Sequence, residues 1–153
     1  MKNKKENILD KCYYSNIRNE MFEFIPTDVE KVLEIGCAEG NFCSLLKNKY
    51  NAEVWGIELC VIPANEAKTK MDNVFIGNFE NTEFELPEKY FDCIVFNDVL
   101  EHFNYPENVL KKSKKYLSAN GVVVASIPNV RYIGNLTELL LKKDWKYKDG
   151  GIL

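Results

Sequence analysis

A short apolar run that breaks into a glycine-containing loop constrains this chain most. Residues 32–35 read Val-Leu-Glu-Ile, which is typical of a buried strand. A loop of small residues follows from Gly36 to Gly40, and a helix is predicted to begin near Asn41. A strand, a tight glycine turn and a helix make the first unit of a doubly wound α/β sheet, in which ligands bind at the carboxyl ends of the strands. We therefore expect a small-molecule site at this loop.

Strands and helices alternate along the rest of the chain. The further strands are expected at residues 53–58, 74–77, 91–96 and 122–127, and the helices at residues 13–24, 41–50, 63–71 and 107–117. The strands are nearly continuous apolar runs, which is typical of a parallel sheet covered by helices on both faces. The prediction is a single α/β domain over residues 13–153, preceded by a flexible tail at residues 1–12.

Charge and cysteine content exclude several classes of protein. The net charge of −3 provides no field that would attract nucleic acid or an anionic membrane. Five cysteines, no Cys-x-x-Cys motif and a single histidine argue against a metal site. No apolar run has the length of a membrane span or a signal peptide. These features predict a reduced, cytoplasmic protein.

Polar and small residues follow each of the first four predicted strands, and they should converge at one edge of the sheet. Glu58 ends the second strand, about 20 residues after the glycine loop, which is the spacing expected in nucleotide-binding folds. Its two carboxylate oxygens match the two hydroxyls of a ribose. The alternative is a solvated acid at a strand end.

The loop itself distinguishes between the ligands that carry an adenosine ribose. Gly36, Ala38 and Asn41 occupy the three glycine positions of the dinucleotide fingerprint, which is a poor match. Residues 32–46 contain no lysine or arginine, whereas Glu34 and Glu39 lie in or beside the loop. This charge disfavours a pyrophosphate and favours a ligand with an ammonium and a sulfonium. S-adenosylmethionine is therefore preferred to NAD.

Four segments together resemble the class I S-adenosylmethionine-dependent methyltransferases. Residues 34–40 are similar to the family's first motif, with Ala38 in place of its middle glycine. Glu58 matches the ribose-binding acid, and residues 77–80 resemble the segment that lies along the adenine. Residues 91–103, which read F-D-C-I-V-F-N-D-V-L-E-H-F, resemble the fourth-strand motif. The combination is far more specific than any one segment.

The resemblance implies a strand order of 3-2-1-4-5, with the last two strands of the family's sheet (order 3-2-1-4-5-7-6) missing from this chain. It also implies roles for individual residues. Gly36, Cys37 and Ala38 would approach the methionine part through their backbone, and Glu34 would help to hold its ammonium. Asn78 would contact the adenine amine and Phe79 would pack on the adenine ring, whereas Asn97 and Asp98 would lie near the sulfonium. Arg18, which forms a pair with Tyr14, would reach the methionine carboxylate. The other implied cofactor-binding residues are Gly40, Asn41 and Leu59.

His102 and Asp98 are the candidate catalytic residues. His102, the only histidine, follows the fourth strand, where it would take a proton from an acceptor hydroxyl. The alternative is a structural histidine that hydrogen-bonds nearby backbone. Methyl transfer is an in-line displacement at an activated sulfonium, so alignment of donor and acceptor can suffice without a base.

The acceptor is the least constrained part of the prediction. The chain lacks the Asn/Asp-Pro-Pro-Tyr signature of enzymes that methylate base amines, and it has no basic patch for nucleic acid. Residues 126–131 and 145–153 resemble bacterial methyltransferases linked to surface-polysaccharide synthesis, which implies a sugar hydroxyl or amine. Two further readings stay open: a module that binds the cofactor without turnover, and an NAD-dependent oxidoreductase domain.

The strand at 122–127 would form an exposed sheet edge, because the two strands that follow it in the family are missing. Its apolar residues have no charged neighbour that would prevent pairing with another chain. Either the chain is truncated at its carboxyl end, or this edge pairs with a second copy in a homodimer.

Overall fold

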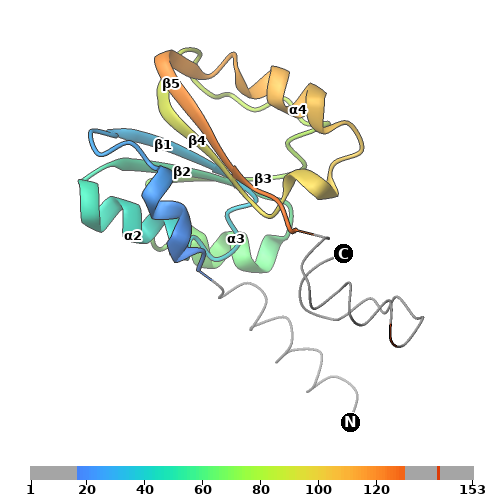
Figure 1. The fold of residues 1–153 in the computed structure, drawn as a ribbon, viewed down its shortest axis with the longest axis horizontal. Helices are drawn as coiled ribbons and strands as arrows, with labels where there is room; N and C mark the ends of the chain where they lie inside the picture. Colours follow the sequence, from blue (N-terminus) through green and yellow to red (C-terminus); the bar gives the residue numbers. More distant parts are fainter. Residues whose placement is uncertain (1–16, 130–140, 142–153) are drawn as a thin grey trace.

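The computed structural model describes residues 17–129 and 141. Five parallel strands form one sheet in the order β3-β2-β1-β4-β5 (Figure 1). These strands are β1 (Lys31–Ile35), β2 (Glu53–Glu58), β3 (Asn73–Ile76), β4 (Phe91–Asn97) and β5 (Leu117–Ser126). The predicted doubly wound α/β class and the strand order 3-2-1-4-5 are both confirmed.

Helices cover both faces of this sheet. They are η1 (Asn19–Phe24), α2 (Asn41–Tyr50), α3 (Val61–Ala67), η2 (Leu100–His102) and α4 (Pro106–Ser113), where η denotes a 3₁₀ helix. The helices η1, α2 and α3 lie on one face and α4 lies on the other (Figure 1). No helix within residues 17–129 is long and apolar enough to cross a membrane.

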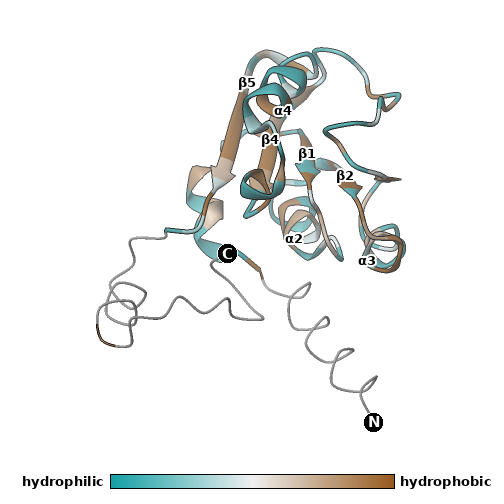
Figure 2. Ribbon diagram, turned by 90° about the vertical axis from the view of Figure 1, so that its right-hand side faces the viewer, coloured by the Kyte–Doolittle hydropathy of each residue, from teal (hydrophilic) through white to brown (hydrophobic). Residues whose placement is uncertain are grey.

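Alternating side chains of the strands build two separate cores, one under each helical layer. Val32 and Val54 pack with Phe42 and Leu46 of α2, whereas Leu33 faces the opposite core. That second core also contains Val109 of α4 and several aromatic rings. Because both faces are buried, the central strands are apolar along most of their length, as the brown ribbons of β1, β2 and β4 show (Figure 2).

The segment before β5 differs from its prediction. The helix α4 ends at Ser113, and β5 begins at Leu117 instead of residue 122. Asn120 and Gly121, which read as a helix-ending turn, lie inside β5 where its register with β4 shifts. A Cβ at Gly121 would come within 2.8 Å of the Phe91 carbonyl oxygen, so the glycine permits a close approach between strands.

Smaller differences occur at other helix ends. The helix predicted at residues 13–24 is observed as the 3₁₀ helix η1, and its residues before 17 lie outside the described part. The helix α3 begins at Val61 and ends at Ala67, so it is shorter than the predicted range 63–71. The predicted tail at residues 1–12 and the segment 145–153 also lie outside the described residues. Met21 and Ile25 are buried against the sheet as expected.

Candidate functional site

The glycine loop after β1 is fastened to the neighbouring strand through its backbone. The amides of Gly36 and Cys37 both donate to the Ile57 carbonyl oxygen, at 2.8 and 3.2 Å. Gly36 has a φ of +74°, and a Cβ there would lie 2.7 Å from Val99 Cγ2. Ala38 also has a positive φ, of 48°. The loop therefore has a tightly determined shape that only a residue without a side chain can adopt at Gly36.

Glu58 lies at the end of β2 and joins two loops of the site. Its Oε2 accepts a hydrogen bond from the Ala38 amide, and its Oε1 accepts one from the Cys60 amide, both at 2.9 Å. The carboxylate is 7% exposed, and each oxygen has a second lone pair. Leu59, the next residue, is 63% exposed and presents an apolar side chain beside it. The ribose contact stays a prediction, and this geometry leaves acceptor capacity for it.

Glu34 and Asn97 form a buried polar pair between β1 and β4. Asn97 Nδ2 donates to Glu34 Oε1 at 2.9 Å, and Glu34 is 3% exposed. Burial raises the pKa of Glu34 to about 7, although hydrogen bonds from Cys43 and from the Asn97 amide partly oppose this rise. Glu34 Oε2 and Asn97 Oδ1 have no hydrogen-bond partner. Two buried acceptor atoms are thus left without a donor at the carboxyl ends of the central strands.

Asp98 links the ends of β4 and β5 to the amino-terminal segment. Its amide donates to Ser126 Oγ at 2.9 Å, and Ser126 Oγ donates to Asp98 Oδ1 at 2.8 Å. Asp98 Oδ2 forms an ion pair with Arg18, which also contacts Glu20. Arg18 therefore pairs with these acids in this structure, and its predicted contact with the methionine carboxylate is untested. Tyr14 lies outside the described residues.

Lys70 places a positive charge beside the glycine loop that the local sequence does not contain. Its Nζ donates to the Glu39 carbonyl oxygen at 3.0 Å and to Asn41 Oδ1 at 2.9 Å, and it pairs with Glu66. The loop is therefore less acidic than residues 32–46, which contain no lysine or arginine, suggest on their own. Asn41, the first residue of α2, uses its amide oxygen for this contact.

The segment after β3 contains one prediction that the structure corrects. The Phe79 side chain is 1% exposed and packs with Phe84 and Tyr116 in the core, so its ring offers no face to an adenine. The aromatic residue was placed in the site because it follows a strand end, but its side chain faces the sheet. Asn78 keeps its position at the strand end, where its Oδ1 accepts the Glu80 amide at 2.8 Å.

The two candidate catalytic residues differ in their surroundings. His102 lies in η2 with an exposed side chain, and its backbone amide donates to the Val99 carbonyl oxygen at 3.1 Å. Asp98 has both carboxylate oxygens engaged by the partners described above. The Cys37 thiol is buried, which raises its pKa, so it fills the turn and is no nucleophile. Within the described residues, no cluster of His, Cys, Asp and Glu side chains is suited to a metal ion.

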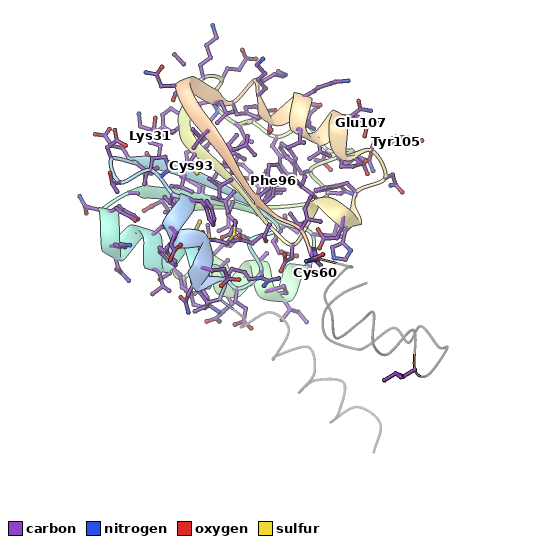
Figure 3. The ribbon with its side chains drawn as sticks, in the orientation of Figure 1. Lys31, Cys60, Cys93, Phe96, Tyr105 and Glu107 are labelled. Carbon is purple, nitrogen blue, oxygen red and sulfur yellow. The ribbon has the colours of Figure 1, made fainter. Side chains whose placement is uncertain are left out.

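Sequence reasoning did not identify Lys70 as a residue near the site, and it assigned no contact to Glu80 or Ser126, although both lie in segments that carry the family resemblance. Each one acts on a residue far away in the chain, and no local motif marks such a contact. Figure 3 shows how the two ends of the sheet are separated, with Lys31 at the amino ends of the strands and Cys60 at the carboxyl ends. All three residues support elements at the carboxyl ends.

Comparison with known proteins agrees with this geometry. A family model described as a methyltransferase domain matches residues 8–150. The chain belongs to the methyltransferase domain family. S-adenosylmethionine is the cofactor that this family and fold imply, as predicted from the sequence.

Individual relatives of this methyltransferase domain act on different molecules. The chain is 31% identical over 138 residues to the mitochondrial ubiquinone biosynthesis O-methyltransferase of Saccharomyces cerevisiae, which covers 82% of this chain and 44% of that protein. It is 29% identical over 129 residues to the phosphoethanolamine N-methyltransferase of Plasmodium falciparum, covering 78% of this chain and 48% of that protein. The methyltransferase domain thus spans about half the length of these curated relatives.

Solved structures show the same fold. A SAM-dependent methyltransferase from Archaeoglobus fulgidus superposes with a TM-score of 0.66 at 22% identity, over 84% of this chain and 59% of that chain. At this identity the similarity establishes the Rossmann-like fold of the methyltransferase domain and nothing about its acceptor.

Proposed function

We propose that this chain transfers a methyl group from S-adenosylmethionine to an oxygen or nitrogen of a small molecule. The observation that carries the proposal is the buried pair of Glu34 and Asn97, which holds two acceptor oxygens without donors beside the glycine loop. Buried polar groups are nearly always hydrogen-bonded, so these two oxygens suit a ligand that brings N–H donors. An ammonium has such donors, whereas a phosphate has none.

The residues present would hold the ammonium, the ribose and the adenine of S-adenosylmethionine. Glu34 Oε2 and Asn97 Oδ1 would accept from the ammonium, and the backbone of the glycine loop would lie along the methionine part. Glu58 would accept from the ribose hydroxyls with its remaining lone pairs. Leu59 supplies exposed apolar surface and Asn78 a polar contact for the adenine. The cofactor supplies a methyl group on a positively charged sulfur, which is an activated leaving group.

The protein's part in catalysis would be to align the two reactants. Asp98 is fixed by Ser126 and Arg18 at the end of β4, where it would line the cleft close to the sulfonium. Because both of its oxygens are engaged, we assign it to positioning and electrostatic stabilisation instead of proton transfer. His102 is exposed in η2 and is the described candidate for removing the proton of an acceptor hydroxyl.

For the acceptor we propose a sugar hydroxyl or amine of a surface polysaccharide. Support comes from the resemblance of residues 126–131 and 145–153 to methyltransferases of that class. The relatives' names give phosphoethanolamine, a ubiquinone biosynthesis step and malonyl-acyl carrier protein as other acceptor chemistries. Because these differ so widely, the acceptor has to be found by assay of labelled methyl transfer into a panel of sugars and small amines.

Calorimetry with S-adenosylmethionine, S-adenosylhomocysteine and NAD tests the cofactor. Both sulfur compounds should bind and NAD should not; the opposite order would overturn the proposal. Glu58→Ala should weaken the binding of S-adenosylhomocysteine sharply. Glu30→Ala, which removes an exposed acid at the amino ends of the strands, should leave the affinity unchanged. Equal affinity of Glu58→Ala and the unaltered protein would remove the ribose assignment.

A module that binds the cofactor without turnover is the second candidate. The observation in its favour is that Asp98 is fully engaged by protein partners, which leaves His102 as the candidate base named from the sequence. Binding of S-adenosylhomocysteine without any methyl transfer across the acceptor panel would favour this candidate. Loss of transfer in His102→Ala, with cofactor affinity retained, would favour the enzyme.

Partners and location stay predictions. Among the strands that the structure describes, β5 lies at one edge of the sheet, and Val122 and Val123 are partly exposed there, which is consistent with the predicted pairing of two copies. Light scattering at several concentrations would test the homodimer. The cysteines Cys37, Cys43 and Cys93 are free and buried, which supports the proposed reducing, cytoplasmic compartment.

A further inference from the structure

The carboxylate of Glu80 joins the segment after β3 to the start of α4. Its Oε1 accepts a hydrogen bond from the Tyr105 amide at 2.6 Å. Its Oε2 accepts from the Asn104 amide at 3.3 Å and from Asn104 Nδ2 at 3.1 Å. Tyr105 and Glu107 mark this start of α4 in Figure 3. Two segments that follow different strands of the sheet are thus connected by one side chain.

The connection crosses the sheet. The strands β3 and β4 are separated by β2 and β1, so the segments that follow them do not adjoin through strand pairing. Glu80 bridges this gap on the face that α4 covers. It also occupies a favourable position for an anion, since Tyr105 is the N-cap of α4 and its own side chain makes no capping bond.

Lys112 of α4 holds the other end of the same segment. Its Nζ donates to the Thr82 carbonyl oxygen at 2.7 Å and pairs with Glu83 at 3.2 Å. The same Nζ lies 5.1 Å from the centroid of the buried Phe79 ring. The segment from residue 78 to residue 83 is therefore attached to α4 at two places.

Asn78 depends on the conformation of this segment. Its Oδ1 accepts the Glu80 amide at 2.8 Å, and its carbonyl oxygen accepts the amides of Asn81 and Thr82 at 3.2 and 2.9 Å. These bonds form a turn over residues 78–82 that contains both the Asn78 side chain and Glu80, so the positions of the two side chains depend on each other. Movement of Glu80 would therefore change the direction of the Asn78 amide.

We propose that Glu80 is a positioning residue that fixes Asn78 against the adenine of the cofactor by attaching its turn to α4. The inference rests on the proposed function, since it concerns the contact of Asn78 with adenine. Glu80 does not touch the ligand; it acts through the turn. The adenine-binding side of the cleft is in this way coupled to η2 and α4, which carry the candidate base His102.

The electrostatics of Glu80 agree with this role. Although partial desolvation opposes the effect, hydrogen bonds from Tyr105 and Asn104 lower the pKa of its carboxyl group. The carboxylate is therefore charged throughout the neutral range, where charge-assisted bonds to backbone amides are strongest.

Calorimetric titration of the full chain with S-adenosylhomocysteine and with S-inosylhomocysteine tests the proposal. The two ligands differ only at one edge of the base, where inosine carries a carbonyl oxygen in place of the amine and a hydrogen on N1. Glu80→Ala should bind S-adenosylhomocysteine about tenfold more weakly, since the turn must then be ordered on binding. It should also lose most of the preference for adenine over hypoxanthine. Glu80→Gln, which keeps the length but only one acceptor oxygen, should lie between. Glu85→Gln is the matched control, because Glu85 is an exposed acid that lies beyond the attached segment.

The outcomes separate this proposal from the function on which it rests. If the unaltered protein binds neither ligand, the proposed function and the role of Glu80 both fall. If it binds and prefers adenine, and Glu80→Ala keeps both affinity and preference, only the role of Glu80 is overturned. If Glu80→Ala loses affinity for both ligands equally, Glu80 is structural and the positioning role is wrong. Should Glu80→Ala fail to fold, Glu80→Gln decides by the same comparison.

Discussion

The two ends of the strands satisfy their buried polar groups in different ways. At the amino ends, the two oxygens of Glu53 accept from Trp55 Nε1 at 2.6 Å and from the Tyr90 hydroxyl at 2.7 Å. Asp92 likewise accepts from the Lys31 amide at 3.1 Å. Side-chain acceptors at this end are matched by donors within the protein, so the end is complete without a ligand.

The carboxyl ends keep acceptors without donors and shape their loops with the backbone. The buried side-chain atoms without partners in the described chain are Glu34 Oε2, Asn97 Oδ1 and Glu101 Oε2, and all three follow or end a strand at this edge. Positive φ angles occur here at Gly36 and Asp98, but they also occur at Asn51 and Lys89 at the amino ends, so only the unmatched acceptors distinguish the two ends. Unmatched acceptors cost stability, and a fold retains them where a ligand supplies the donors. This difference supports the proposed ligand site at the carboxyl ends without reference to any motif.

The largest effect is expected from the backbone of the carboxyl end. Gly36→Ala should lower the free energy of unfolding by about 3 to 4 kcal/mol, because an alanine is strained at φ +74° and its Cβ would overlap Val99. Chemical denaturation measures this loss.

Val99→Ala provides the matched background for that experiment. It removes the methyl group that the new Cβ would meet. The loss in free energy of unfolding of the double variant should therefore be smaller, by about 1 kcal/mol or more, than the sum of the losses of the two single variants. Strict additivity would show that the contact with Val99 does not restrict the loop.

The next effect concerns the pH dependence of stability. Glu34 has a pKa raised from 4.5 to about 7 by burial, so the folded state holds a proton between these values that the unfolded state has released. Its contribution to stability is fully present below pH 4.5 and is lost as the pH rises to about 7. The difference corresponds to about 3 kcal/mol.

The contribution of Glu34 is isolated by comparison with Glu34→Gln, measured by denaturation at pH 4.5 and pH 7.5. Acids with lowered pKa values, such as Asp72, contribute the opposite slope at low pH, but they cancel in the difference between the two proteins. If the difference in free energy of unfolding between the two proteins does not change with pH, Glu34 is solvated and does not provide a buried site for an ammonium.

A smaller loss is expected at the amino ends. Asp92→Ala removes the acceptor for the Lys31 and Glu30 amides and for Ser118 Oγ, and it should lower the free energy of unfolding by about 2 kcal/mol. The affinity for S-adenosylhomocysteine should stay unchanged. Asp28→Ala, at an exposed position in the preceding turn, should change stability by less than about 0.5 kcal/mol. Weaker ligand binding in Asp92→Ala would contradict the conclusion that only the carboxyl ends contribute to the ligand site.

The parts of the fold predicted well from the sequence are those with strong local signals. The helix at residues 41–50 and the strand at 53–58 are observed with the predicted bounds, because a glycine turn and a continuous apolar run mark them. The start of β5 was not predicted, since Asn120-Gly121 reads as a turn unless the pairing with β4 is known. Tertiary pairing here overrides the local preference.

The candidate site shows the same division. The sequence predicted which residues lie at the carboxyl ends of the strands, such as Glu58 and Asn97, because the end of each apolar run marks the end of a strand. The sequence did not predict the direction or the partner of a side chain. Phe79 faces the core, and Lys70 reaches the glycine loop from beyond α3. These depend on contacts between residues far apart in the chain.

Two serines give the finest test of the comparison, since each hydroxyl supports one aspartate at one end of the sheet. Ser126 Oγ accepts the Asp98 amide and donates to its carboxylate, and it holds Asp98 at a φ of 49°. Ser126→Ala should therefore cost about 1 kcal/mol of stability. It should also weaken the binding of S-adenosylhomocysteine severalfold, because Asp98 would leave the position at the end of β4 that we propose for it beside the cofactor. Ser118 Oγ donates to Asp92 at 3.1 Å, but Asp92 keeps two backbone donors without it. Ser118→Ala should cost less stability and leave the affinity unchanged. Equal effects of the two variants on affinity would mean that the carboxyl end is not the separate functional end that its unmatched acceptors indicate.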